Sequence, residues 1–251
     1  MDDHPQRPRC YADPASWGEN AVVLSKSETH HLVHVLRHDI GAAVTVIDGL
    51  GRLAHGKIVD FVDQCAVISI EENLVEKPAP FAVEVVQAIP KKGRMEAVLQ
   101  KATELGADAV QPIVTQRTIV RLDKERAKRK HERWRSIIIE AAKQCRRTKA
   151  PALKPVIDFE QFLSLQTERD LLILCSLEDD AQPLKDVVES IDYSRVGSVK
   201  ILVGPEGDFT AEEYRAARDA GAKPVTLGKL VMRTDTATLY MLSILNYLLE
   251  V

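Results

Sequence analysis

Short runs of apolar, β-branched residues alternate with amphipathic stretches along the latter part of the chain. The runs that predict strands cover residues 83–89, 110–114, 171–175, 199–203 and 224–227. Strands that are apolar on both faces and separated by helices typically form a mostly parallel sheet with helices packed against it. This alternation therefore predicts an α/β domain.

Periodicity and capping residues predict the helices between these strands. One apolar stripe comprises Met95, Val98, Leu99, Ala102 and Leu105, with Gly106 as a C-terminal cap, and a second comprises Trp134, Ile138, Ala141 and Cys145. Thr210 and Glu213 form a capping box that begins a further helix. The last helix is expected over residues 235–249, with Thr234 or Asp235 as its N-cap.

The N-terminal part has the pattern of a small all-β domain. Strands are predicted at residues 21–24, 43–48 and 65–70, and Asp48-Gly49 is a hairpin signal. One helix is expected over residues 28–37, where apolar residues recur at helical spacing. Residues 73–80 contain two prolines and predict a linker. We therefore expect a barrel domain over residues 1–73 and the α/β domain over residues 74–251.

Composition indicates an ordinary globular protein, with 45% hydrophobic and 28% charged residues. The sequence contains no apolar run of membrane-spanning length and no apolar segment typical of a signal peptide, so we expect a cytoplasmic protein with no membrane partner. The cysteines, Cys10, Cys65, Cys145 and Cys175, have no CxxC spacing. We expect buried, reduced thiols and no metal site, and we interpret His30, His31, His34, His38 and His55 as surface or barrel residues.

Charge is distributed unevenly along the chain. The formal net charge is −3, yet residues 121–149 hold twelve Lys or Arg against four Asp or Glu, which leaves −11 for the rest. A cationic segment of this kind is suited to a phosphate backbone. The alternative is a solvated helix face, and charge alone does not decide between the two.

Residues 201–210, ILVGPEGDFT, form the most informative segment of the chain. A buried strand is followed by a Gly-Pro-Glu-Gly turn and a capped helix, and ligands of open α/β sheets bind at the carboxyl ends of strands. Gly204 and Gly207 are expected to allow close backbone approach and positive φ. The segment lacks the GxGxxG and GxxxxGK[ST] patterns, so dinucleotide and P-loop enzymes are poorly supported. The alternative is a helix-entry turn with only a packing role.

A second segment, residues 227–237, LGKLVMRTDTA, joins the last strand to the last helix and is expected at the same edge of the sheet. Arg233 precedes the helix N-terminus, where a cation opposes the helix dipole. An electrostatic task, such as facing a phosphate, would explain it.

Four motifs together resemble the RsmE family, the 16S ribosomal RNA uridine-N3 methyltransferases. They are Gly204-Pro-Glu-Gly, LGKLVMRTDTA at 227–237, QKATELG at 100–106 and HHLVHVLR at 30–37. The resemblance covers nearly the whole chain in order. It implies a PUA-like RNA-binding barrel, a SPOUT methyltransferase domain with a C-terminal trefoil knot, and a homodimer.

The resemblance also implies which residues bind the two substrates. The residues expected to bind S-adenosylmethionine are Leu174, Cys175, Ser176, Gly204, Pro205, Glu206, Gly207, Leu227, Gly228, Leu230, Met232, Thr234, Thr236 and Ala237. The cations expected to contact 16S rRNA, within a small ribosomal subunit or its precursor, are Arg7, Arg9, Lys91, Lys92, Arg94, Arg117, Arg121, Arg146 and Arg147.

The sequence departs from the family pattern at several positions. Asp208 stands where the family commonly has glycine, and Leu230, Met232 and Asp235 differ from the usual LGxRILRTETA. The basic helix usually carries an acidic residue near the position of Lys143 and often a glycine at Arg146. We expect the backbone geometry to survive, because Asp tolerates turn conformations.

Methylation of uridine N3 requires loss of its imide proton, so the site needs alignment, a proton acceptor and stabilisation of negative charge. We expect the catalytic residues to be Arg233, which would stabilise the anionic uracil or its phosphate, and Glu206, which would orient the donor or accept the proton. Orientation is favoured for Glu206, because a carboxylate beside a sulfonium is a weak base. The alternatives are a SPOUT enzyme acting on another RNA site and a non-catalytic RNA-binding protein.

Overall fold

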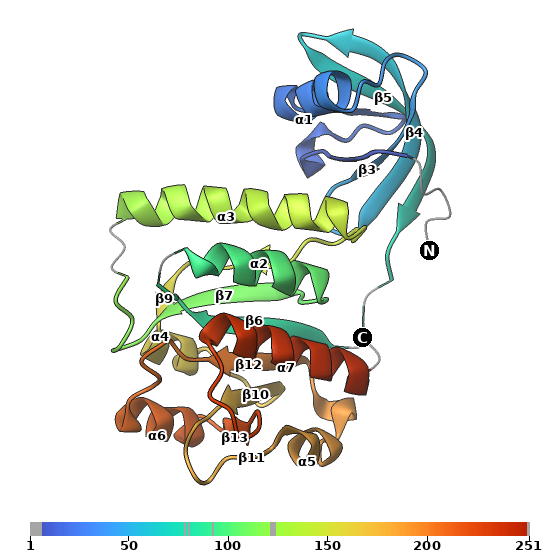
Figure 1. The fold of residues 1–251 in the computed structure, drawn as a ribbon. Coiled ribbons are helices and arrows are strands. Elements are labelled where there is room, and N and C mark those ends of the chain that lie inside the picture. Colours follow the sequence, from blue (N-terminus) through green and yellow to red (C-terminus); the bar gives the residue numbers. More distant parts are fainter. Residues whose placement is uncertain (1–6, 78, 80, 92, 121–123, 250–251) are drawn as a thin grey trace. The chain divides into compact units, whose positions relative to one another are not determined.

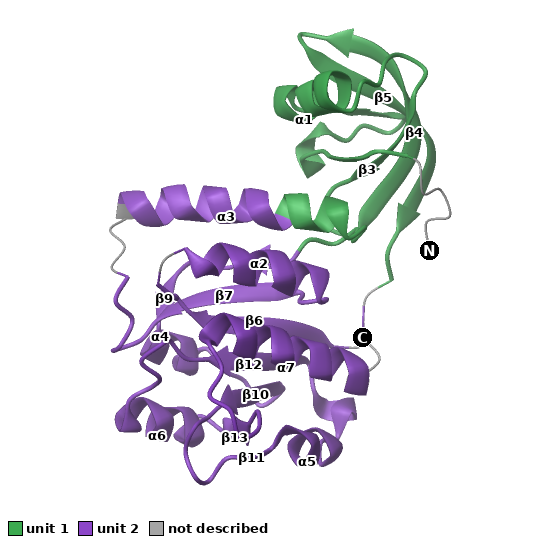
Figure 2. Cartoon of the chain, viewed as in Figure 1, with its two compact units in different colours: residues 1–78, 139–150 green, residues 79–138, 151–251 purple. Residues whose placement is uncertain are grey.

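The computed structural model describes residues 7–77, 79, 81–91, 93–120 and 124–249 (Figure 1). Contacts divide the chain into two compact units, shown in Figure 2. The first lies within residues 1–78 and 139–150, and the second within residues 79–138 and 151–251. The division of the chain after residue 73 stays a prediction.

The first unit is a β-sheet with a short helical segment. Its strands are β1 (Arg9–Tyr11), β2 (Ala21–Val23), β3 (Ala43–Ile47), β4 (Arg52–Val62) and β5 (Cys65–Val75), paired in the order β1-β3-β4-β5-β2. The hairpin predicted at Asp48-Gly49 joins the antiparallel strands β3 and β4. A core that includes Leu32, Val44, Ile58 and Ile68 is fully buried.

The helical segment of this unit differs from the single helix expected over residues 28–37. Helix α1 (Lys26–His30) begins earlier, because Ser25 caps it by accepting a 3.2 Å hydrogen bond from the Glu28 N–H. A π-helical turn, His31–Val35, continues it. Arg37, with φ of 60°, then takes the chain out of helical conformation.

A buried ion pair joins residues 139–150 to the rest of the first unit. These residues include the end of α3 (Lys124–Gln144), where the Lys143 ammonium lies 2.7 Å from Glu28 and 2.8 Å from Glu140. Burial acts to lower the pKa of Lys143, but hydrogen bonds to the two glutamates outweigh it and raise the pKa. Lys143, a departure from the family pattern, is therefore a structural residue here.

The second unit is the predicted α/β domain with a parallel sheet. Its main strands are β6 (Ala82–Ala88), β7 (Ala109–Val114), β10 (Asp170–Cys175), β12 (Ser198–Val203) and β13 (Lys223–Thr226). The short strands β8 (Ala152–Leu153), β9 (Ile157–Asp158) and β11 (Gln182–Pro183) extend it, in the order β11-β13-β10-β12-β6-β7-β8 with β9 beside β7. Neighbouring strands are parallel throughout the described residues.

Helices of this unit pack in pairs against the sheet (Figure 1). Helix α2 (Arg94–Glu104) contacts α7 (Thr234–Leu249), and α4 (Phe159–Ser164) contacts α6 (Ala211–Asp219), while α5 (Leu184–Glu189) follows β11. The capping box of Thr210 and Glu213 is confirmed at the start of α6. Gly106, with φ of 87°, ends α2 as predicted. Among the described residues, the helices lack the length and apolar character that crossing a bilayer requires.

Parallel pairing places several strand ends at one edge of the sheet. β12 lies between β6 and β10, with Val203 opposite Gln87 and Leu202 opposite Leu174. β13 lies on the other side of β10, with Val225 opposite Cys175. The segments that follow β10, β12 and β13 therefore lie close together. In open α/β sheets, ligands bind at this carboxyl edge of the strands.

Candidate active site

A cavity of about 270 Å³ lies at this edge of the sheet. Its walls come from the ends of β10, β12 and β13 and from the start of α7. The predicted donor-binding residues that line it are Cys175, Ser176, Gly204, Pro205, Glu206, Leu227, Gly228, Leu230, Met232, Thr234 and Ala237. It is also lined by the predicted catalytic Arg233 and by Leu177, Val203, Asp208, Thr226 and Val231.

The three other predicted donor-binding residues lie outside this lining. Leu174 is completely buried inside β10, where it packs in the core beneath the cavity. Gly207 faces the Arg117 side chain, since a Cβ at Gly207 would lie 3.4 Å from the Cβ of Arg117. Thr236 is exposed on the first turn of α7. The local sequence could not show which residues line the cavity and which of their neighbours do not, because this depends on the direction of each side chain at the end of its strand.

The Gly-Pro-Glu-Gly turn makes the close approach expected at Gly204. A Cβ there would lie 3.0 Å from the Phe209 ring, so a side chain would fit only if the ring moved by a few tenths of an ångström. Neither glycine uses the positive φ that it permits, and within this turn it is Asp208 that has a φ of 63°. The left-handed conformation at residue 208 explains why a glycine is common there in the family, and Asp is among the residues that tolerate it.

Asp208 is held in this conformation by Tyr214 on α6. The Tyr214 hydroxyl donates to the Asp208 carboxylate at 2.8 Å, and the Phe209 N–H donates to the same oxygen at 2.8 Å. Burial raises the pKa of Tyr214, and the neighbouring Asp208 carboxylate raises it further. The phenol therefore stays protonated and remains a hydrogen-bond donor at neutral pH. Neither residue was predicted as part of the site.

Arg117, predicted as an RNA contact, braces the same turn from the outside. One guanidinium nitrogen donates to the main-chain carbonyls of Gly207 at 2.7 Å and of Phe209 at 3.1 Å. These bonds fix the backbone on both sides of Asp208. At least one N–H group of the Arg117 guanidinium is therefore used in hydrogen bonds within the protein.

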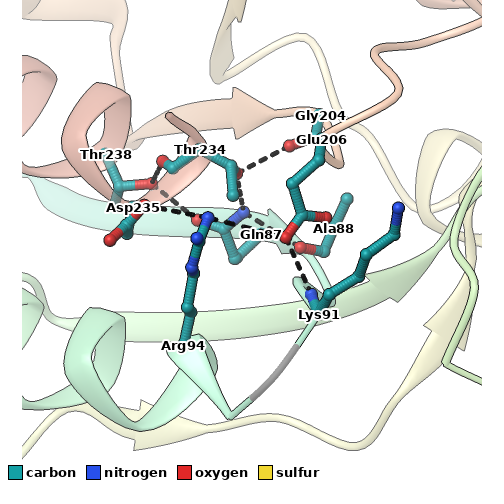
Figure 3. Close-up of polar contacts among 9 residues, drawn as sticks. All are labelled: Gln87, Ala88, Lys91, Arg94, Gly204, Glu206, Thr234, Asp235 and Thr238. Atoms are coloured by element: carbon teal, nitrogen blue, oxygen red, sulfur yellow. Dashed lines mark hydrogen bonds and ion pairs between the residues drawn. The ribbon is translucent and has the colours of Figure 1, made fainter. Parts of the chain in front are cut away.

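Glu206 is tied to the segment that follows β6 (Figure 3). The Lys91 N–H donates to its Oε1 at 2.9 Å, and an Arg94 guanidinium nitrogen lies 3.8 Å from the same oxygen. Arg94 also lies 4.0 Å from Asp235 on α7. The protein itself therefore orients the carboxylate of Glu206. Arg94, predicted as an RNA contact, is shared between two acidic residues.

The start of α7 corrects the predicted cap. The helix begins at Thr234, and the Ala237 N–H donates to the Arg233 carbonyl at 2.8 Å, so Arg233 occupies the N-cap position. The Thr234 hydroxyl does not cap the helix and instead donates to the Gly204 carbonyl at 2.7 Å. Arg233 is exposed and lines the cavity.

Cys175 lines the cavity with an uncharged side chain. Burial raises the pKa of its thiol to about 12, so at neutral pH it is a protonated, apolar contact rather than a nucleophile. In the described part of the chain, no three His, Cys, Asp or Glu side chains gather in a group that could hold a metal ion.

The remaining cations predicted to contact RNA fall into two groups. Lys91 belongs to the second unit, and Arg7, Arg9, Arg146 and Arg147 belong to the first. The Arg9 guanidinium donates to the Arg147 carbonyl at 3.4 Å, so these two lie together. Lys92 and Arg121 lie outside the described residues.

Comparisons with known proteins agree with this geometry. The family model described as RNA methyltransferase domain matches residues 77–246, and that described as RNA methyltransferase PUA domain matches residues 24–60. Ribosomal RNA small subunit methyltransferase E of Bacillus subtilis is 31% identical over 90% of both chains. The chain belongs to this family, RsmE.

Two solved structures of relatives match this chain over almost its whole length. A crystal structure of ribosomal RNA small subunit methyltransferase E from Neisseria gonorrhoeae, bound to S-adenosyl methionine, is 31% identical with a TM-score of 0.84. A putative methyltransferase from Legionella pneumophila, in complex with bound SAM, gives the same values. Each covers 96% of this chain, and 98% of each relative is covered in turn. The resemblance inferred from motifs, with its PUA-like unit and mostly parallel α/β domain, is therefore confirmed.

Proposed function

We propose that this chain transfers a methyl group from S-adenosylmethionine to N3 of a uridine in 16S ribosomal RNA. The observation that carries the proposal is the cavity built from the ends of β10, β12 and β13 and the start of α7. Relatives that align over nearly the whole chain are named ribosomal RNA small subunit methyltransferase E, and two SAM-bound structures share the fold.

The cavity has the chemistry that the donor needs. Leu227, Leu230 and Val231 supply apolar surface for an adenine ring. Pockets that bind small molecules are usually lined by such apolar side chains. The carboxylate of Glu206 lies at the wall, held by the Lys91 N–H, where it favours a positively charged group. S-adenosylmethionine, when bound, supplies an electrophilic methyl group on a sulfonium.

Arg233 and Glu206 have separate tasks in this proposal. Deprotonation of uridine N3 leaves negative charge on the uracil, and the Arg233 guanidinium at the cavity mouth stabilises that charge or fixes the adjacent phosphate. Glu206 orients the donor, because its Oε1 already accepts a hydrogen bond from the Lys91 N–H and lies 3.8 Å from the Arg94 guanidinium, which hold the carboxylate in place.

RNA is bound by the PUA-like unit together with cations of the second unit. Arg7, Arg9, Arg146 and Arg147 supply positive charge on the first unit, and Lys91 supplies it on the second. The substrate in this proposal is a small ribosomal subunit or its precursor, and the compartment is the cytoplasm.

A homodimer and a trefoil knot belong to the same proposal. Tyr240 and Tyr247 lie two helical turns apart on α7 and are 41% and 84% exposed, which suits a contact with a second copy. The knot is carried over from the family resemblance, and the start of α7 contacts both β6 and the turn after β12.

Nucleoside mapping by mass spectrometry tests the proposal. Ribosomal RNA from cells without the gene should lack one N3-methyluridine in the 16S molecule, and purified protein with S-adenosylmethionine should restore it. A missing modification at another base would favour a SPOUT enzyme with a different target. Binding of RNA without binding of the donor would favour a non-catalytic role.

A further inference from the structure

Gln87 is a polar residue in the apolar strand β6, at the edge of the sheet where the cavity lies. Its side chain is completely buried, and in the sheet it lies opposite Val203, the last residue of β12. Burying a primary amide is unfavourable unless its hydrogen-bonding groups find partners. The partners of Gln87 therefore indicate why this residue occupies the strand end.

Every hydrogen of the Gln87 amide has a partner (Figure 3). Its Nε2 donates to the Ala88 carbonyl at 2.9 Å and to the Thr234 hydroxyl oxygen at 2.8 Å. The Thr238 hydroxyl donates to its Oε1 at 2.6 Å. The orientation of the amide follows from chemistry, since the Ala88 carbonyl only accepts and would repel Oε1 at the same distance.

This orientation fixes the direction of the next hydrogen bond. Because the Gln87 amide donates to Thr234, the Thr234 oxygen accepts and its single proton is left for another acceptor. That acceptor is the Gly204 carbonyl, at 2.7 Å. A relay thus runs from the Gln87 amide through the Thr234 hydroxyl to the Gly204 carbonyl.

The relay ends on the peptide unit that begins the donor-binding turn. The residue after Gly204 is Pro205, which has no N–H, so the carbonyl is the hydrogen-bonding group of that peptide. Gly204 and Thr234 both line the cavity, on walls that come from β12 and α7. Gln87 itself is absent from the lining of this cavity.

We propose that Gln87 and Thr234 are positioning residues, which hold the Gly204 turn and the start of α7 at the spacing that S-adenosylmethionine requires. The inference rests on the proposed function and adds Gln87 to the residues on which it depends. It also changes the predicted role of Thr234 as a donor-binding residue, because its hydroxyl donates to the Gly204 carbonyl and not to the ligand.

Replacing Thr234 tests the relay, because valine has nearly the same shape and lacks the hydroxyl. Thr234→Val should weaken donor binding about 10-fold or more, since the Gly204 carbonyl and the Gln87 amide both lose a partner. Thr234→Ser keeps the hydroxyl and should stay within about 2-fold of the wild type. Calorimetric titration with S-adenosylmethionine gives the affinities, and thermal melting reports folding.

Thr238→Val is the matched control. Thr238 is also completely buried and its hydroxyl bonds Gln87 and the main-chain carbonyl of Thr234, but it does not reach Gly204 and does not line the cavity. This variant should lower the melting temperature while leaving donor affinity close to that of the wild type. An equal loss of affinity in the two valine variants, or none in Thr234→Val, would overturn the inference.

Gln87→Glu extends the test if Thr234→Val does not fold. At a pH where residue 87 is ionised, a carboxylate of the same shape has no hydrogens to donate, so Thr234 would turn its proton toward residue 87 and away from Gly204. Donor affinity should again fall about 10-fold or more, and unchanged affinity in a folded Gln87→Glu protein would contradict the relay. Failure of the wild type itself to bind S-adenosylmethionine would instead contradict the proposed function.

Discussion

Glu206 and Lys91, 115 positions apart in the sequence, meet at the wall of the cavity through a 2.9 Å hydrogen bond from the Lys91 N–H to the Glu206 carboxylate. The bond joins the turn after β12 to the segment after β6. Arg94, 3.8 Å from the same oxygen, adds a positive charge behind it. The cavity and a predicted RNA-contacting segment therefore share one carboxylate.

Substitution of Glu206 separates its hydrogen bond from its charge. Glu206→Gln keeps an acceptor for the Lys91 N–H but removes the charge, and we expect donor affinity to fall by about 5-fold to 10-fold. Glu206→Ala removes both, and the loss should reach about 100-fold. Calorimetry with S-adenosylmethionine measures both variants. Equal affinities for the two would mean that the bond to Lys91 does not position the carboxylate.

Arg233→Ala should lower methyl transfer far more than donor binding. In the proposed mechanism the guanidinium stabilises the charge that develops on the uracil, so single-turnover methylation should fall by about 100-fold or more. Donor affinity and melting temperature should change little. Arg233→Lys should recover part of the rate, because an ammonium supplies charge without the planar fork. Full activity per donor-bound Arg233→Ala enzyme would remove Arg233 from the mechanism.

Arg146 has a φ of 64° just after the end of α3. Left-handed conformation is unfavourable for any residue with a Cβ, so Arg146→Gly should be more stable than Arg146→Ala by about 1 kcal/mol. The two variants lose the same side-chain interactions, and their difference isolates the backbone. Denaturant unfolding measures it, and an alanine variant as stable as the glycine variant would contradict the prediction.

Stability should depend on pH through Asp170. Burial acts to raise its pKa, but hydrogen bonds from Ser198, Lys200 and Thr167 outweigh burial and lower the pKa from 3.8 to about 2. A carboxyl with a lowered folded pKa contributes stability above its unfolded pKa and loses it as pH falls through the folded value. Asp170 should therefore contribute up to about 2 kcal/mol above pH 4, and this contribution should disappear toward pH 2.

Asp170→Asn checks this contribution, since the variant cannot ionise at residue 170. Denaturant unfolding between pH 2 and 5 should show a weaker rise in stability with pH than in the wild type. Ser198→Ala removes one donor to the carboxylate and should shift the curve in the same direction by less. If both variants showed the same pH dependence as the wild type, protonation of Asp170 would not contribute to the free energy of unfolding.

The sequence by itself determined the architecture and the edge of the sheet where the site lies. Period and residue type are local properties, and they were enough to predict β6, β12, the capping box at Thr210 and the turn beginning at Gly204. A polar residue at the end of an apolar strand was also visible at Gln87, although its meaning was not.

Only the tertiary structure decided the roles of the individual side chains. Gln87 meets Thr234 across 147 positions, and Arg117 meets Gly207 across 90, because parallel pairing brings strand ends together that are far apart in the chain. The same holds for backbone conformation: two glycines in the turn permit a positive φ, yet it is Asp208 that adopts one, held by Tyr214 from α6. A local pattern specifies which backbone conformations a residue tolerates, whereas its partner in space depends on which elements become neighbours when the core is buried.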